Sequence, residues 1–146
     1  MVRVRPLDVS DLDALRAFAA ATPGVGEAPG RGAVAFYART GHAFVAETDA
    51  GVRGFAFAAA VWDGERPTVR LARLAFGGDD VDAVRAALLE AVTKSAYDAA
   101  VYDLVAEVAE DDAATAAWLR QAQWRARPVT TFVRTLGSRG GGDAGG

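Results

Sequence analysis

Residues 69–96 read V-R-L-A-R-L-A-F-G-G-D-D-V-D-A-V-R-A-A-L-L-E-A-V-T-K-S-A, and this stretch decides the fold. The part before the glycines alternates between apolar and larger or charged side chains, which is the period of a β-strand. Gly77 and Gly78 end the alternation, and apolar residues recur at helical spacing from Val81 onward. Three aspartates within residues 79–82 stand where acids favour a helix start. The stretch predicts a strand, a glycine turn and a helix, a unit in which many α/β proteins hold a phosphate-bearing cofactor.

The composition is typical of one soluble globular domain. The chain has 146 residues, of which 51% are hydrophobic and 24% charged. No apolar run approaches the ~20 residues that cross a bilayer, and the N-terminal M-V-R-V-R-P does not resemble a signal peptide. We therefore expect a cytoplasmic protein without a membrane partner. A single domain is predicted over residues 1–136, followed by a flexible glycine-rich tail at 137–146.

Several chemistries are excluded by what the sequence lacks. There is no cysteine, which removes disulfides, thiolate metal sites and cysteine nucleophiles. His42 is the single histidine, so a multi-histidine metal centre is excluded, and no metal site is predicted. The net charge of −3 and the pI of about 5.1 argue against a nucleic-acid partner.

The rest of the chain predicts further strands and helices in a mixed sheet. Strands are expected at 2–5, 42–47, 52–62, 101–108 and 129–136, and helices at 8–21, 33–39 and 112–122. Ser10 and Asp13 are spaced like a capping box at the first helix. The strand at 52–62 has almost no polar residue on either face, which predicts a homodimer, with helices of the same chain as the alternative cover.

The order of these elements is similar to that of the GNAT acyltransferase fold. Residues 5–15 resemble the usual GNAT opening, residues 44–55 its second-to-third strand hairpin, and residues 112–124 the family motif N-x-x-A-x-x-L-Y-x-x-x-G-F. The resemblance implies an α/β (α+β) fold with a mixed, mostly antiparallel sheet of six or seven strands and about four helices. The central strand would be interior, and the sheet would splay near Phe76 and Val105.

Three shorter segments resemble a narrower group of proteins. F-Y-A-R-T-G-H begins at Phe36, K-S-A-Y-D-A-A-V-Y at Lys94 and R-T-L-G-S-R-G at Arg134. All three are similar to segments of a small bacterial GNAT-related family of unknown function. This narrower resemblance implies no particular reaction.

The GNAT resemblance also implies acetyl-CoA as the cofactor. By position, the residues that would bind it are Leu74, Phe76, Ala83, Val84 and Arg85. The family's Q/R-x-x-G-x-G/A loop is altered, because Asp80 falls on the first position and Ala83 and Arg85 fall on the two small residues. A carboxylate about 4 Å from a phosphate costs ~1 kcal/mol in water and ~4 kcal/mol at an effective dielectric of 20, whereas the helix dipole returns ~0.3–1 kcal/mol. We therefore expect weak or undetectable binding of acetyl-CoA.

The catalytic residues implied by the resemblance are also altered. The tyrosine that serves these enzymes as a general acid falls on Leu119, which has no proton to donate. Glu107 is the remaining candidate for a base acting through water. The alternative is a Glu107 that is exposed or paired with Arg70 or Arg73.

Arg73 is a candidate substrate-binding residue. Strict alternation places it on the same face as Val69, Leu71 and Ala75. An arginine among apolar neighbours needs a partner. That partner is either an acidic substrate or an internal carboxylate.

Tyr37, His42 and Trp62 are the other candidate substrate-binding residues. The two aromatic residues could line an acceptor pocket, although core or interface packing explains them equally well. His42 titrates near neutrality and could act as a base, or it could simply be hydrogen-bonded.

Three functions remain open from the sequence. The first, which accounts for the altered motifs, is a weak or non-catalytic GNAT relative that binds a small molecule or an acylated side chain in the central cleft. The second is an active N-acyltransferase that transfers an acetyl group from acetyl-CoA to an amine. The third is a dimeric structural or regulatory module.

Overall fold

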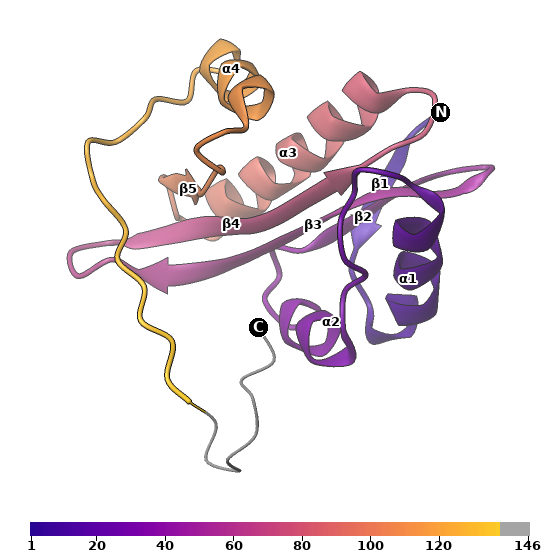
Figure 1. Cartoon of the computed structure of the whole chain (residues 1–146), viewed down its shortest axis with the longest axis horizontal. Coiled ribbons are helices and arrows are strands. Elements are labelled where there is room, and N and C mark those ends of the chain that lie inside the picture. Colours follow the sequence, from indigo (N-terminus) through magenta and orange to yellow (C-terminus); the bar gives the residue numbers. More distant parts are fainter. Residues whose placement is uncertain (138–146) are drawn as a thin grey trace. The chain divides into compact units, whose positions relative to one another are not determined.

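A computed structural model gives the fold of residues 1–137 (Figure 1). The elements in chain order are β1 (Arg3–Pro6), the 3₁₀ helix η1 (Val9–Asp11), α1 (Leu12–Ala21), α2 (Arg31–Tyr37), β2 (Phe44–Thr48), β3 (Gly51–Trp62), β4 (Pro67–Phe76), α3 (Val81–Asp98), β5 (Leu104–Ala106) and α4 (Ala113–Gln121). The chain forms two compact units, Met1–Glu107 and Val108–Gly146. The described part of the second unit contains α4. The expected domain at 1–136 stays a prediction, and residues 138–146 of the expected tail lie outside the described residues.

The sheet confirms the predicted α/β class and the interior place of the central strand. Its order is β1-β2-β3-β4-β5, with every pair antiparallel except β4 and β5. It has five strands rather than six or seven, because residues 129–136 form no strand. Val129, Phe132 and Val133 of that segment are 69%, 91% and 84% exposed. Such β-prone residues form a strand only where a ladder partner is available.

The pairing of β4 with β5 is short. It is parallel and joins Val69 with Leu104, Arg70 with Val105 and Leu71 with Ala106. Residues 72–76 of β4 therefore have no strand partner on that side among the described residues. Val105 lies within this ladder, so the splay expected near Phe76 and Val105 stays a prediction.

A β-bulge interrupts β4 at Ala72. Phe57 of β3 lies opposite Arg73, and Ala58, the next residue, lies opposite Leu71. Ala72 is therefore the extra residue that has no partner across the ladder. A bulge of this kind bends a strand and changes the direction of the side chains that follow it.

The bulge corrects the face that was predicted for Arg73. Residues directly opposite each other share a face, and neighbours along a regular strand do not. Arg73 consequently shares a face with Phe57 and Ala75, whereas Val69 and Leu71 point to the other face. Period-two alternation predicts a single face for all four β4 residues, and it fails because one inserted residue exchanges the faces.

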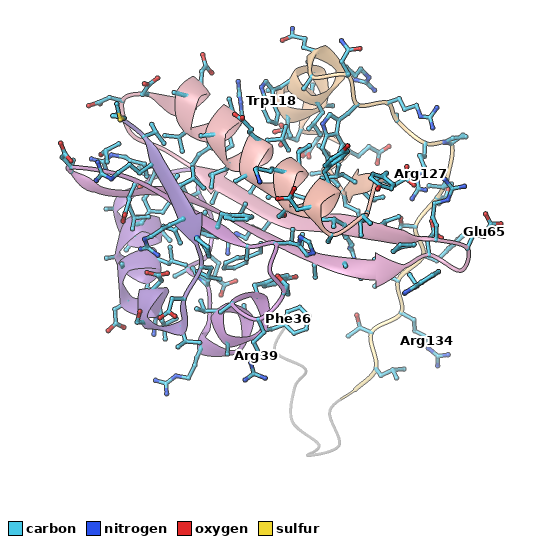
Figure 2. All side chains as sticks on the ribbon, turned by 180° about the vertical axis from the view of Figure 1, so that it is seen from behind. Phe36, Arg39, Glu65, Trp118, Arg127 and Arg134 are labelled. Carbon is cyan, nitrogen blue, oxygen red and sulfur yellow. The ribbon has the colours of Figure 1, made fainter. Side chains whose placement is uncertain are left out.

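Helices of the first unit cover both faces of the sheet. Figure 1 shows α1 and α2 in front of the sheet, and Figure 2, seen from behind, shows α3 along the opposite face. Residues 54–58 of β3 are all buried, so the helices of the same chain provide the cover there. The core on the α1 and α2 side consists of Leu7, Leu15, Phe18, Val34, Ala43, Val45, Phe55, Phe57 and Ala75. No helix within residues 1–137 is long and apolar enough to span a membrane.

The first helical segment is fixed by a capping box and an ion pair. The Asp8 carboxylate accepts a bond from the Ser10 N–H at 2.9 Å, and the Asp11 carboxylate accepts one from the Asp8 N–H at 2.8 Å. The capping box expected at Ser10 and Asp13 is wrong, because η1 precedes α1 and begins earlier. Burial alone would raise the pKa of Asp11, but the bonds from Arg5 and from the Asp8 N–H outweigh it and lower the pKa.

Candidate functional site

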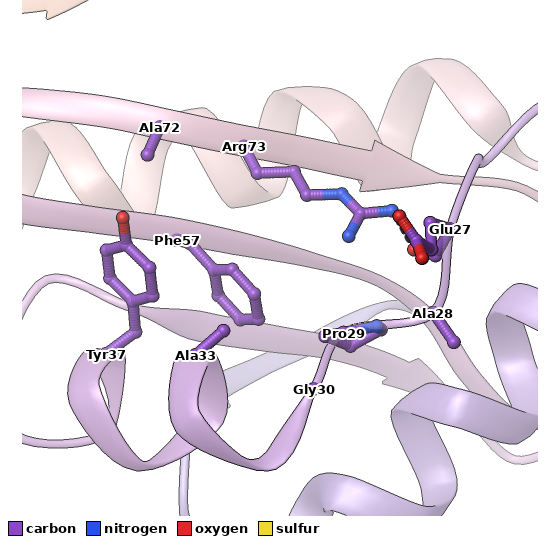
Figure 3. Close-up of a pocket in the computed structure, with 9 residues that line it drawn as sticks. All are labelled: Glu27, Ala28, Pro29, Gly30, Ala33, Tyr37, Phe57, Ala72 and Arg73. Atoms are coloured by element: carbon purple, nitrogen blue, oxygen red, sulfur yellow. Dashed lines mark hydrogen bonds between the residues drawn. The ribbon is translucent and has the colours of Figure 1, made fainter. Parts of the chain in front are cut away.

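A cavity of about 490 Å³ lies on the α1 and α2 side of the sheet (Figure 3). Its volume falls within the range of small-molecule sites in proteins. The cavity belongs entirely to the first unit. Its walls are loop residues 27–30, Ala33 and Tyr37 of α2, Phe57 of β3, and Ala72 and Arg73 of β4.

Aromatic rings form one wall of this cavity. Tyr37 and Phe57 are stacked, with ring centroids 4.8 Å apart and an angle of 8° between the planes. Phe36 meets Tyr37 edge to face at 4.9 Å. Figure 2 shows Phe36 at the surface, where it is 58% exposed. This part of the cavity wall is therefore apolar, and it also carries the Tyr37 hydroxyl.

The loop between α1 and α2 holds Arg73 at the other end of the cavity. Its Nη2 donates to the Val25 carbonyl at 3.2 Å and to the Glu27 carbonyl. The guanidinium carbon lies 5.1 Å from the centroid of the Phe55 ring. Gly26 has a φ of +95°, a left-handed conformation that glycine adopts without strain, and this lets the loop turn around the guanidinium. Backbone carbonyls thus bind one terminal nitrogen of the guanidinium.

The Arg73 guanidinium is only partly satisfied by these contacts. Its Nε and Nη1 make no hydrogen bond to any residue within 1–137. Burial lowers the pKa of Arg73, and the charge of Glu27 acts in the opposite direction. The side chain remains a cation, because arginine does not lose its proton in proteins. Figure 3 shows the guanidinium at the Glu27 end of the cavity, with one terminal nitrogen directed inward.

The structure brings only two of the predicted substrate-binding residues together. Tyr37 and Arg73 line the cavity, whereas His42 and Trp62 do not. His42 is 7% exposed, and its Nδ1 lies 2.9 Å from the Ser95 Oγ of α3. Trp62 ends β3 and is 74% exposed. A site that uses all four residues at once is therefore not formed.

Glu107, the candidate base, forms an ion pair with Arg70. The two side chains are 54% and 49% exposed, so solvent screens the pair. This pairing is one of the alternatives expected from the sequence. A role for Glu107 as a base stays a prediction.

The turn between β4 and α3 is filled by an arginine. The Gly77 N–H donates to the Arg53 carbonyl at 2.9 Å. Gly78 has a φ of +93°, and a Cβ there would lie 2.7 Å from Cδ of Arg53. Asp80 is the N-cap residue of α3, but its side chain makes no capping bond.

The cofactor-binding positions implied by the resemblance surround this turn. Arg85 donates to the Asp82 carboxylate at 3.0 Å, and its guanidinium carbon lies 5.6 Å from the centroid of the Phe76 ring. Val84 is 1% exposed, so its side chain belongs to the core. The remaining two, Leu74 and Ala83, are half-buried.

The second unit, described by itself, contains the altered tyrosine position. The Asp112 carboxylate accepts a bond from the Thr115 N–H at 3.1 Å and caps α4. Leu119, where the family motif has its tyrosine, is 8% exposed. Its carbonyl accepts a bond from the Trp124 N–H at 2.9 Å, which closes the end of the helix.

The sequence did not indicate two parts of the cavity. From the sequence, Phe57 is one member of an apolar strand, and residues 27–30 lie in a segment with no predicted element. The sequence does not show that Phe57 lines a cavity, because its stacking partner Tyr37 comes from a distant element, α2. A loop rich in glycine beside a strand arginine is the one signal that could have pointed here.

The fold defines the class of protein. An aminoglycoside N-acetyltransferase, AAC(6')-Iy, solved in complex with CoA, is 16% identical with a TM-score of 0.76, over 92% of this chain and 95% of that chain. AAC(6')-Ih from Acinetobacter baumannii is 16% identical with a TM-score of 0.73, over 94% and 100%. These similarities confirm the GNAT fold.

A more similar relative and a family match show the family of the chain. The protein TTHA1254 from Thermus thermophilus is 38% identical with a TM-score of 0.74, over 94% of this chain and 99% of that chain. Residues 27–143 match the family described as protein of unknown function (DUF1999). The chain belongs to this family. No curated protein matches the chain significantly.

Proposed function

We propose that this GNAT-fold protein binds a small molecule, or an acylated side chain of that size, in the cavity between the α1–α2 loop, α2, β3 and β4. The observation that carries the proposal is the bulge at Ala72, which turns Arg73 into the cavity that Tyr37 and Phe57 wall. Bulges frequently redirect side chains beside functional sites. A cavity with an apolar wall and one charged group is also the usual form of a small-molecule site.

The turn before α3 supports the prediction that coenzyme A binds weakly or not at all. A pyrophosphate cradle needs open space above its glycines and free backbone N–H groups. Here the side chain of Arg53 lies against Gly78, and Arg85 bonds to Asp82. With Asp80 also at the start of the helix, these residues do not fit a pyrophosphate.

Fragment screening by NMR tests the cavity. We expect small aromatic fragments to shift the amide signals of residues 27–37. Ala28→Trp, which places a large ring in the exposed rim of the cavity, should reduce the shifts several-fold. Ala50→Trp, in the exposed β2–β3 turn, is the matched control and should leave them unchanged. Fragments that bind elsewhere, or equally well to the Ala28→Trp protein, would remove the basis of the proposal.

An active N-acyltransferase is the second candidate. It is favoured by the fold, since the CoA-bound aminoglycoside acetyltransferase aligns with 92% of this chain. The hydrophobic Leu119 at the tyrosine position counts against it. Calorimetry with acetyl-CoA at physiological salt separates the two. We expect no binding at micromolar concentrations, and a micromolar dissociation constant would favour the enzyme.

We further propose that the protein forms a homodimer. Exposed aromatic residues gather at one end of the sheet, where Trp62 pairs across the ladder with Pro67 and Tyr102 comes shortly before β5. Tyr97 contacts Tyr102, with ring centroids 5.6 Å apart. Exposed clusters of this kind commonly mark interfaces. A dimeric structural or regulatory module is the third candidate function, and it depends on this dimer.

The cytoplasmic location stays a prediction.

A further inference from the structure

We propose that the cavity selects anions, and that its ligand is a small carboxylate with a flat apolar body anchored by Arg73. The inference rests on the proposed small-molecule function and adds the chemical class of the ligand. It depends on three observations, namely the unused donors of Arg73, the difference in exposure between Arg73 and Glu27, and the stacked rings opposite them.

The donor count of Arg73 leaves a place for an anion. A guanidinium has five N–H donors, and the two on Nη2 face the carbonyls of Val25 and Glu27. These bonds fix the plane of the group. Nη1 is then held in place with both of its donors available, and one carboxylate oxygen at Nη1 would form a charge-assisted hydrogen bond.

The two charged groups in the cavity are not equivalent. Arg73 is half-buried, and burial lowers its pKa, which shows that its charge has lost solvation. Glu27 is exposed, so water already solvates its carboxylate. A desolvated charge gains more from a partner than a solvated one does. The cavity should therefore prefer an anion at Arg73 over a cation at Glu27.

The rest of the cavity fits an apolar body attached to that carboxylate. The stacked rings of Tyr37 and Phe57 line the cavity together with Ala33 and Pro29, so this part of its wall is apolar. Flat rings gain from stacking or edge contacts beyond simple burial. Phenylacetate, with a carboxylate one carbon from a ring, is a suitable probe of this arrangement.

The test compares three probes of nearly equal shape by NMR titration: phenylacetate, the neutral phenylacetamide and the cationic phenethylamine. We expect phenylacetate to bind about tenfold or more tightly than either of the others, because a hydrogen bond to a charged group is worth roughly that factor. The Ala28→Trp protein should lose the binding of phenylacetate. Equal affinity for the three probes would overturn the inference.

Variants of two arginines on the same strand assign the effect. Arg73→Gln keeps a donor for the loop but removes the charge, and it should abolish the preference for phenylacetate over phenylacetamide. Arg70→Gln, also on β4 but exposed, should leave that preference unchanged. If Arg73→Gln does not fold, as judged by thermal unfolding, the three-probe comparison on the wild-type protein still tests the preference for an anion. The NMR signals of the Arg73 side chain then test the assignment, because phenylacetate should shift them and unchanged signals would overturn it.

The outcomes separate this inference from the proposed function. Binding in the cavity without regard to charge keeps the proposed function and overturns the inference. No cavity binding by any probe or fragment overturns both. A preference for phenylacetate that is unchanged in Arg73→Gln overturns the assignment to Arg73, and a preference lost only in that variant supports it.

Discussion

At the scale of single residues, His42 is a buried group whose surroundings favour the neutral imidazole. The Ser95 Oγ donates its one proton to the Val92 carbonyl at 2.7 Å, so it can only accept from the His42 Nδ1–H. Burial lowers the pKa of His42 below its ordinary 6.5. Burial thus favours the neutral imidazole, which contacts Ser95 of α3.

The buried His42 predicts a pH-dependent stability near neutrality. The unfolded chain takes up a proton near pH 6.5, and the folded chain does so only at lower pH. The stability is therefore full above pH 6.5 and falls as the pH drops toward the folded-state pKa. Urea unfolding should show a lower free energy of unfolding at pH 5 than at pH 8. This difference between the two pH values should be smaller in His42→Gln. His42 is the only histidine, so an equal loss in both proteins would contradict the assignment.

At the scale of elements, α3 packs closely on the sheet at Gly54. A Cβ at this position would lie 2.6 Å from the Ala75 carbonyl oxygen, 3.0 Å from Leu88 Cδ1 and 3.1 Å from Val84 Cγ1. The first of these contacts is with backbone, which cannot move without disturbing the β3–β4 ladder. The close approach of helix and sheet therefore depends on this glycine.

Two glycine substitutions test this packing. Gly54→Ala should lower the free energy of unfolding by about 1–3 kcal/mol, because overpacking displaces the ladder or α3. Gly32→Ala, in α2, meets no atom within 4 Å and should raise it by about 0.5–1 kcal/mol. Urea denaturation of the two variants provides the measurement. A Gly54→Ala protein as stable as the wild type would show that α3 can shift without cost.

The turn before α3 gives a second prediction for an element. If acetyl-CoA binding is weak but measurable, Asp80→Arg should tighten it several-fold by removing a like charge near the phosphates. Arg85→Ala should weaken it by a similar factor. Calorimetry of the two variants checks both directions. The reverse pattern would place the phosphates away from this turn.

The sequence predicts the elements better than it predicts the site. The unit of β4 and α3 was predictable because alternation, glycines and acids all agree there. The segment at 129–136 has the same β-prone pattern but no ladder partner, which local sequence cannot reveal. The face of Arg73 was missed for a related reason, since the extra residue Ala72 leaves no mark on composition or spacing.

At the scale of the whole molecule, the exposed aromatic residues predict self-association. Val61 and Trp62 are 42% and 74% exposed at the end of β3, and Tyr97 and Tyr102 are 69% and 70% exposed. We expect a dimer by sedimentation at micromolar concentration and a shift toward monomer in Trp62→Ser. Phe36→Ser, 58% exposed on α2 in the wild type, is the control. A 15.2 kDa species at every concentration would exclude the dimer.

The extra residue in β4 also bears on how this cavity could be redesigned. The polarity of a binding cavity is usually changed by amino-acid substitution. Here, however, the face of the sheet to which the Arg73 side chain points depends on the position of the β-bulge in β4. Moving the irregularity from Ala72 to Leu74 would place Ala72 opposite Phe57 and turn Arg73 toward α3. The cavity would lose its cation with no change in amino-acid content, which makes strand register a design variable in its own right.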